Sequence, residues 1–205
     1  MGNIWAKFWK PDEEVEEGLP DITEEMEDVI QMACNSRGET LIKAYQIDIS
    51  RKDIDTLQGL NWLNDNVINF YLSMIVKRSK ENDSWPNVYA TNTFFYPKIM
   101  QQGHSAVKRW TRKVDIFDHG LMLVPVHLGM HWCLATVDFE KKGVFYYDSM
   151  GGRNDRCLDA LLKYLEDEHM DKKKAPLDPP ASKWHREIVK DIPQQMNGKN
   201  GLFHM

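Results

Sequence analysis

Two residues near the middle of the chain, His131 and Asp148, have the chemistry of a proton-transfer pair. They lie at the outer ends of two segments rich in β-branched and aromatic residues, 132–139 and 144–148. The short polar connection between these segments predicts an antiparallel hairpin in which Gly143 takes a positive φ. Counting outward from that turn places His131 beside Asp148. A carboxylate in that position fixes the imidazole tautomer and stabilises the imidazolium, as in a catalytic triad. Ordinary rim residues at a hairpin end would give the same pattern.

The three cysteines do not supply an obvious nucleophile for such a base. Cys34, Cys133 and Cys157 are odd in number and lack CxxC spacing, which fits a reducing compartment and argues against both a disulfide framework and a zinc site. Cys133 follows His131 by two positions and shares its strand face, so its side chain is expected to lie alongside the imidazole, as part of the core. Cys157 falls among leucines and is expected to be buried.

A zinc hydrolase built on His127 and His131 is a further alternative. Their i, i+4 spacing would bring both rings to one metal only on a helix. Gly129, among strand-forming residues, argues against a helix there. The sequence therefore predicts no metal site.

Overall charge narrows the range of partners. The 205 residues include 26 basic and 31 acidic side chains, a net charge of -5, which argues against non-specific nucleic-acid binding. There is no apolar run long enough to span a membrane, and the first residues lack the apolar stretch of a secretory signal. We therefore expect neither nucleic acid nor membrane among the partners.

Helical patterns precede the hairpin. The spacing of Asp21 and Glu24 suggests a capping box, opening a helix that Gly38 ends. Ser50 and Asp53 suggest a second, short capped helix. A longer amphipathic helix follows Trp62, and a short strand is expected over 88–92. The apolar face of the longer helix is predicted to consist of Leu63, Val67, Phe70, Tyr71, Met74 and Ile75.

After the hairpin, Gly151-Gly152 predicts a sharp turn and Asn154 predicts a helix cap. The helix after Asn154 carries a leucine stripe within 158–165, and 184–192 is expected to return as a strand. Helices, then strands, then a helix and a strand predict an α+β domain.

Five longer segments carry a family resemblance: LNWLNDNVINFY, AVKRWTRKVDIF, VPVHLGMHWCLATVDF, YYDSMGG and IPQQMNG. Their order and spacing, from about Leu19 to Gly198, resemble the catalytic domain of the SUMO-specific (sentrin-specific) cysteine proteases. The resemblance implies a papain-like α+β fold over 19–198, with a central mixed or antiparallel sheet flanked by helices. An acidic tail over 1–18 and a divergent end over 199–205 would flank it. It also implies SUMO and SUMO-conjugated proteins as partners, no cofactor, a monomer, and location in the nucleus with the cytoplasm as a second site.

The resemblance assigns roles to individual residues. His131 would be the general base, Asp148 its orienting carboxylate, and Gln195 a donor to the oxyanion formed on the scissile carbonyl. Trp62 and Trp132 would enclose the Gly-Gly tail of SUMO, because only glycines are thin enough to pass between two indole faces. The residues implied to recognise the folded body of SUMO are Asp65, Phe94, Arg109, Trp110 and His127.

The chain departs from the family pattern at the nucleophile. The family continues into an Asp-Cys-Gly motif, whereas this sequence reads KNGLFHM and has Gly201 where the cysteine is expected. We therefore expect the chain to be inactive, as a form truncated by splicing or by an incorrect gene end, and a non-catalytic SUMO-binding module is the alternative. Because the family continues into further core helices, the leucine stripe and the helix over 63–75 are expected to be partly uncovered.

Overall fold

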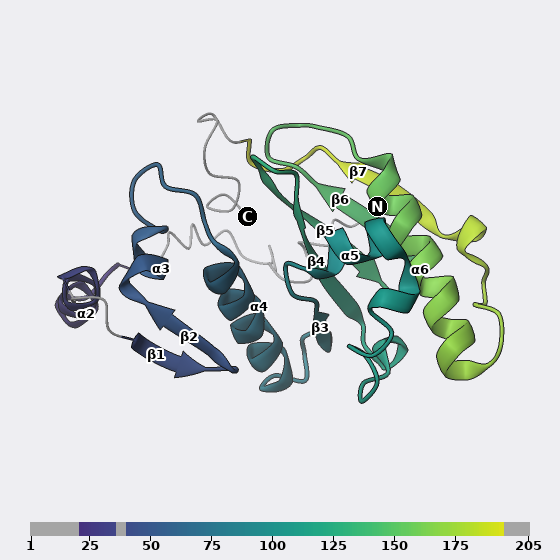
Figure 1. Cartoon of the computed structure of the whole chain (residues 1–205), viewed down its shortest axis with the longest axis horizontal. Coiled ribbons are helices and arrows are strands. Elements are labelled where there is room, and N and C mark those ends of the chain that lie inside the picture. The colour runs from purple at the N-terminus through teal and green to yellow at the C-terminus, as the bar shows by residue number, and fades with distance from the viewer. Residues whose placement is uncertain (1–20, 36–39, 195–205) are drawn as a thin grey trace.

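The computed structural model describes residues 21–35 and 40–194, and a five-stranded sheet forms its centre (Figure 1). The strand order is β3-β4-β5-β6-β7. The inner strands β4, β5 and β6 are antiparallel, whereas β3 and β7 run parallel to their neighbours. This mixed sheet flanked by helices confirms the predicted α+β class. The strands are β3 (Val88–Ala90), β4 (Leu121–His127), β5 (Trp132–Asp138), β6 (Gly143–Tyr147) and β7 (His185–Val189).

Helices cover both faces of this sheet, so β4 is buried on both sides. Because successive strand residues point to opposite faces, Met122, Val124 and Val126 join one core cluster, while Leu121 and Leu123 join another. The first cluster contains residues of α5 and α6, and the second contains residues of α4 (Figure 1). The helices are α4 (Asp65–Lys80), α5 (Phe95–Gln102) and α6 (Asp155–Lys173), with short 3-10 turns η1 (His104–Ala106), η2 (Ile116–Asp118) and η3 (Ala181–Lys183).

A smaller unit precedes α4. It consists of α2 (Glu24–Asn35), the two-stranded sheet of β1 (Thr40–Ala44) and β2 (Ile47–Ser50), and α3 (Arg51–Asp55). The capping box predicted between Ser50 and Asp53 is confirmed. The cap predicted for α2 is two residues off, because the Oγ1 of Thr23, rather than Asp21, accepts a hydrogen bond from the N–H of Met26 (3.3 Å). The predicted end at Gly38 lies outside the described residues.

The predicted hairpin is confirmed, but the role of its glycine is different. The positive φ falls on Lys142 (51°), while Gly143 begins β6 and pairs with Asp138. Gly143 is needed for space, because an added Cβ would lie 2.7 Å from the ring of Phe145.

The predicted apolar face of α4 was only partly right. Leu63 is buried and Val67 and Ile75 pack against the same cluster, but the face is centred about one position further around the helix. Ile68 and Leu72 are the buried apolar residues, while Tyr71 and Met74 are 54% and 46% exposed. The two stripes are adjacent on a helical surface, and contact with the β3–β4 side of the sheet decides between them.

The predicted cap and leucine stripe of α6 are confirmed. The Asn154 side chain accepts a hydrogen bond from the N–H of Cys157 (3.1 Å). The expectation that the leucine stripe would be partly uncovered was wrong, because the sheet covers it: Leu158, Leu161, Leu162 and Leu165 are each at most 2% exposed. Among residues 21–35 and 40–194, no helix combines the length and apolar content that a bilayer span requires.

Candidate active site

His131 lies in the tight turn that joins β4 to β5. The N–H of Leu128 donates to the carbonyl of His131 (2.9 Å), and Gly129 takes a φ of 87° that suits few other residues. The turn leaves Leu128 and Met130 exposed, while only 11% of the His131 side chain is accessible. The imidazole therefore lies at the edge of the sheet with limited access to solvent.

Asp148 follows β6 directly and is held by the turn that comes after it. Its Oδ1 accepts hydrogen bonds from the Nε2 of His131 (2.7 Å) and from the N–H of Met150 (2.8 Å). Gly151 takes a φ of 74°, and an added Cβ at Gly152 would lie 2.4 Å from the Oδ2 of Asp148. The Gly-Gly turn is thus packed against the carboxylate, and only a residue without a side chain fits at position 152.

The contact between His131 and Asp148 confirms the pairing expected from the hairpin, although it is diagonal rather than directly cross-strand. β5 and β6 pair Leu134 with Tyr147, a register that continues to Cys133 and Asp148. Because an ionised carboxylate only accepts hydrogen bonds, the Nε2 of His131 donates to it and Nδ1 is left as the basic nitrogen. The pair can therefore take a proton from a group that approaches Nδ1.

Cys133 lies next to this pair but is poorly suited to be a nucleophile. It is 2% exposed, and burial, together with the charge of Asp148, raises the pKa of its thiol to about 12. Burial likewise raises the pKa of the Cys157 thiol to about 12. Both predictions of core cysteines are confirmed. A thiol with so high a pKa contributes almost no thiolate near neutral pH.

The side chains of His131, Cys133 and Asp148 are also the described residues that could hold a metal ion. One ligand atom from each lies within 4.8 Å of the others. A cation bound by these three side chains would compete with the His131–Asp148 hydrogen bond. It would also have to displace the proton of the Cys133 thiol, whose pKa is raised to about 12. The arrangement therefore suits proton transfer better than metal binding. His127, the second ligand of the zinc alternative, lies on β4 and not on a helix.

Trp132 is packed beside the histidine by two contacts. Its Nε1–H donates to the carbonyl of Leu63 (3.0 Å), and its ring stacks on that of His127 at a centroid distance of 4.2 Å. The first contact brings the Trp62–Leu63 segment to the start of β5. Trp132 is buried, whereas Trp62 keeps partial exposure. The structure thus places the two predicted tail-binding tryptophans at neighbouring segments, beside the proton-transfer pair.

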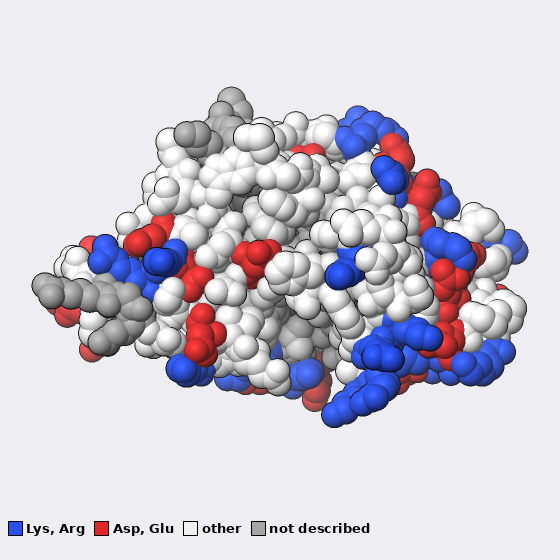
Figure 2. All heavy atoms as spheres, viewed as in Figure 1, with Lys and Arg blue, Asp and Glu red and all other residues white. Residues whose placement is uncertain are grey.

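The other predicted recognition residues lie on three separate segments. Asp65 begins α4 and is partly exposed, Phe94 precedes α5 and is 54% exposed, and Trp110 is 39% exposed. Arg109, beside Trp110, is also exposed. Figure 2 shows one face of the molecule, and Lys and Arg side chains gather at its lower right, over the end of α6 and the adjoining segments. Gln195 and Gly201 lie outside the described residues.

Two contacts of the site were not predicted from the sequence. The first is the close packing of Gly152 against the Asp148 carboxylate, and the second is the hydrogen bond from Trp132 to the Leu63 carbonyl. The Gly-Gly dipeptide was a signal for the first, but it indicated only a sharp turn. The second carried no local signal, because the two partners are 69 positions apart.

A histidine held by a carboxylate at the strand ends of a mixed sheet defines the base half of a hydrolase that uses a side-chain nucleophile. Comparison with known families makes the class specific. Residues 61–203 match the model of the Ulp1 protease family, C-terminal catalytic domain. The chain belongs to the Ulp1 protease family.

Similar proteins agree with this assignment. The chain is 49% identical over 166 residues to a sentrin-specific protease of Caenorhabditis elegans, covering 80% of this chain and 24% of that protein. It is 43% identical over 192 residues to sentrin-specific protease 2 of Rattus norvegicus, covering 91% of this chain and 32% of that protein. This chain therefore spans a third or less of the length of these two relatives.

Solved structures show the same fold. The C-terminal Ulp1 protease domain in complex with SMT3, the yeast ortholog of SUMO, superposes with a TM-score of 0.75 at 31% identity, covering 88% of this chain and 79% of that one. The SUMO protease Ulp1 with its catalytic cysteine oxidised to a sulfinic acid gives the same TM-score at 32% identity, covering 88% of this chain and 78% of that one. The predicted protease fold is thus confirmed.

Proposed function

We propose that this chain is the SUMO-recognising part of a cysteine protease that hydrolyses the bond after the Gly-Gly tail of SUMO. We further propose that it binds SUMO without cleaving it while glycine occupies position 201. The observation that carries the proposal is the 2.7 Å hydrogen bond between His131 and Asp148, beside the buried Trp132. The relatives named as sentrin-specific proteases and the Ulp1–SMT3 complex support SUMO as the ligand.

In the proposed reaction of the family, a cysteine thiol loses its proton to the Nδ1 of His131. The resulting thiolate attacks the carbonyl carbon of the terminal glycine, the scissile C–N bond breaks, and the amine leaves with the proton that His131 had taken up. The glycine carbonyl remains bound to sulfur as a thioester, which water then hydrolyses to the glycine carboxylate and the free thiol. Asp148 holds the ring and stabilises the imidazolium through Nε2. Gln195 is proposed to donate its amide to the oxyanion.

Within the described ranges, the thiols near the base do not replace the missing nucleophile. Cys133 and Cys157 are buried, and the pKa of each is raised to about 12. Cys34 lies on α2, in the smaller N-terminal unit (Figure 1). We therefore expect this chain to bind SUMO without hydrolysing it. The experiments below test it as a non-catalytic binding module.

The test combines two measurements on the whole chain. Isothermal titration with mature SUMO ending in Gly-Gly is expected to show binding that Trp132→Ala weakens. A SUMO–reporter fusion is expected to stay intact with the chain and with its His131→Ala variant. Cleavage that His131→Ala abolishes would overturn the non-cleaving half of the proposal. Absence of SUMO binding by the folded chain would overturn the whole proposal.

We also propose that the chain acts as a monomer in the nucleus, with the cytoplasm as a second location, and that nucleic acid is not a partner. The net charge of -5 supports the last point. Light scattering of the purified chain and fluorescence microscopy of a tagged chain test the first two points. A dimeric mass, or a signal confined to the cytoplasm, would contradict them.

A further inference from the structure

A fully buried carboxylate outside the candidate active site has no part in the proposed reaction. Glu168 on α6 is 0% exposed. Its Oε2 lies 2.5 Å from the Nε2 of His104, and its Oε1 accepts a hydrogen bond from the Oγ1 of Thr111 (2.5 Å). The ammonium group of Lys172 lies 4.0 Å from the same Oε1. Burying a carboxylate is costly unless such partners compensate for the lost water, so this cluster has to be assembled in the folded chain.

The partners of Glu168 bracket a segment with a predicted recognition function. His104 begins η1 and Thr111 follows seven residues later, so the exposed Arg109 and Trp110 lie between the two points of attachment. Lys172, one turn after Glu168, donates hydrogen bonds to the carbonyl groups of Thr111 and Val114. The last turns of α6 therefore hold both ends of the segment that presents Arg109 and Trp110.

Tyr164, one turn before Glu168, connects α6 to the same surface by ring contacts. Its ring meets that of Phe95 edge-on at a centroid distance of 4.9 Å. The ring of Phe95 in turn lies 6.2 Å from that of Trp110. Phe94, the neighbouring residue, is exposed. One face of α6 thus sets the positions of Phe94 and Trp110 relative to each other.

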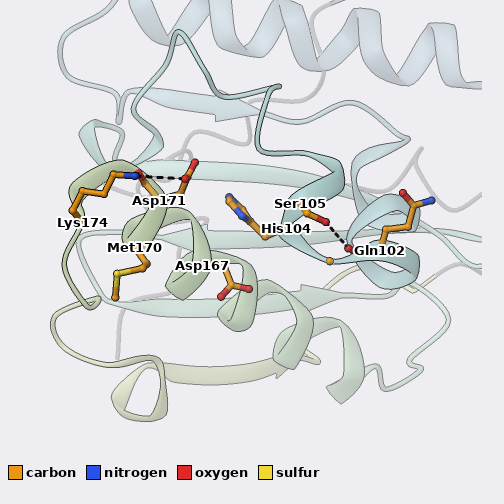
Figure 3. A pocket seen from close by; sticks show the side chains of 8 residues that line it. Gln102, His104, Ser105, Asp167, Met170, Asp171 and Lys174 are labelled. Carbon is orange, nitrogen blue, oxygen red and sulfur yellow. Dashed lines mark hydrogen bonds and ion pairs between the residues drawn. The ribbon is translucent and has the colours of Figure 1, made fainter.

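Figure 3 shows the outer side of this junction, a surface hollow of about 700 Å³ where His104 lies beside α6. The two aspartates that line it are already paired, Asp167 with Lys163 (2.6 Å) and Asp171 with Lys174 (3.7 Å). Glu168 lies behind His104 and is closed to solvent. The polar groups at this junction thus bind one another within the chain. The surface left exposed to a partner is the one that carries Arg109 and Trp110.

We propose that Glu168 is a positioning residue for SUMO recognition: through His104 and Thr111 it fixes the segment that presents Arg109 and Trp110 to the folded body of SUMO. This inference rests on the proposed function. Glu168 itself touches no ligand, so removing its carboxylate should change the affinity of the folded chain for SUMO.

Isothermal titration of the whole chain with mature SUMO tests the proposal, since it reports the dissociation constant and the fraction of competent chains separately. Glu168→Ala is expected to raise the dissociation constant by about tenfold with unchanged stoichiometry. Glu168→Gln should stay within about threefold of the parent, because its amide can accept from Thr111 and donate to a neutral His104. Asp167→Ala, a neighbouring surface carboxylate on the same helix, is the matched control and should have no effect.

A double-mutant cycle checks the route of the effect. In an Arg109→Ala, Trp110→Ala background, Glu168→Ala should add little, because the segment it positions no longer contributes contacts. Additive losses would overturn the proposal. So would an unchanged dissociation constant with reduced stoichiometry, which indicates a role in folding alone.

Three further outcomes have to be distinguished. If circular dichroism shows that Glu168→Ala does not fold, Thr111→Val, which removes only the hydroxyl donor, takes its place with the same expected weakening. A parent chain that does not bind SUMO overturns the proposed function together with this inference. A parent chain that binds, with Glu168→Ala unaffected, overturns this inference alone.

Discussion

The close packing of Gly152 against Asp148 allows a sharp test of the proton-transfer pair. In Gly152→Ala, the new Cβ would lie 2.4 Å from the Oδ2 of Asp148. The two atoms must separate by about 1 Å to reach an ordinary van der Waals contact. Because the 2.7 Å bond from the Nε2 of His131 ends on the same carboxylate, a shift of that size disrupts it.

The expected magnitude follows from the interaction that is lost. A hydrogen bond to a charged group contributes about 1.5–3 kcal/mol, so the free energy of unfolding should fall by about that amount. Gly151→Ala is the matched control: it forces a side chain into a φ of 74°, with the Oε1 of Gln194, 3.5 Å away, as its nearest neighbour. Its backbone strain should cost about 1–2 kcal/mol while leaving the pair intact.

Two measurements separate these effects. Denaturant unfolding gives the free energies, and proton NMR detects the hydrogen-bonded ring N–H of His131, assigned by its absence in His131→Gln. This ring signal should disappear or move in Gly152→Ala and persist in Gly151→Ala. A signal that is unchanged in Gly152→Ala, or lost equally in both variants, would refute the assigned geometry.

Three further predictions concern the surroundings of the site. Alkylation by iodoacetamide at pH 8 should modify Cys34 before Cys133. With a pKa of about 12, only about one Cys133 thiol in ten thousand is ionised at that pH. Mass spectrometry that finds Cys34 and Cys133 modified at similar rates would contradict the burial of Cys133. Asn154→Ala removes the cap that accepts from the N–H of Cys157 and should cost about 1 kcal/mol, or about 2–4 °C in thermal midpoint, which calorimetry would measure; an unchanged midpoint would contradict the cap. Burial opposes ionisation of the Asp53 carboxyl, but hydrogen bonds from Ser50 and two asparagines outweigh it and lower its pKa below 3.8. The ionised carboxylate therefore stabilises the fold fully at pH values well above 3.8, and this stabilisation is lost as the pH falls through the lowered pKa. Thermal midpoints measured against pH should show a weaker acid dependence in Asp53→Asn, and an identical dependence would contradict the assignment.

The elements nearest the candidate site could be predicted from the sequence because their signals are local. Segments rich in β-branched and aromatic residues and a short polar turn predicted β5 and β6, and equal counting from that turn predicted the contact of His131 with Asp148. The Asn154 cap and the leucine stripe likewise predicted α6. Each of these features depends on residues a few positions apart, or on a hairpin whose short connection sets its register.

Errors arose where side-chain packing decides the outcome. Tyr71 and Ile68 lie on adjacent stripes of α4, and only the position of the sheet determines which stripe is buried. Gly143 looked like a turn glycine, but it lies in β6, where the ring of Phe145, two positions along the same strand, excludes a side chain. The local pattern shows neither the position of the sheet against α4 nor the direction in which the Phe145 ring turns.

The sequence by itself determined the chemistry available to this protein: an imidazole, a carboxylate at hairpin distance, tryptophans nearby, and glycine where the family has its nucleophile. Only the tertiary structure decided that Trp132 bonds to the Leu63 carbonyl and that Glu168 joins His104 to Thr111. The physical reason is separation along the chain. Periodicity and turn chemistry act over a few residues, whereas a buried polar group takes its partners from whichever segments the packing of the core brings beside it.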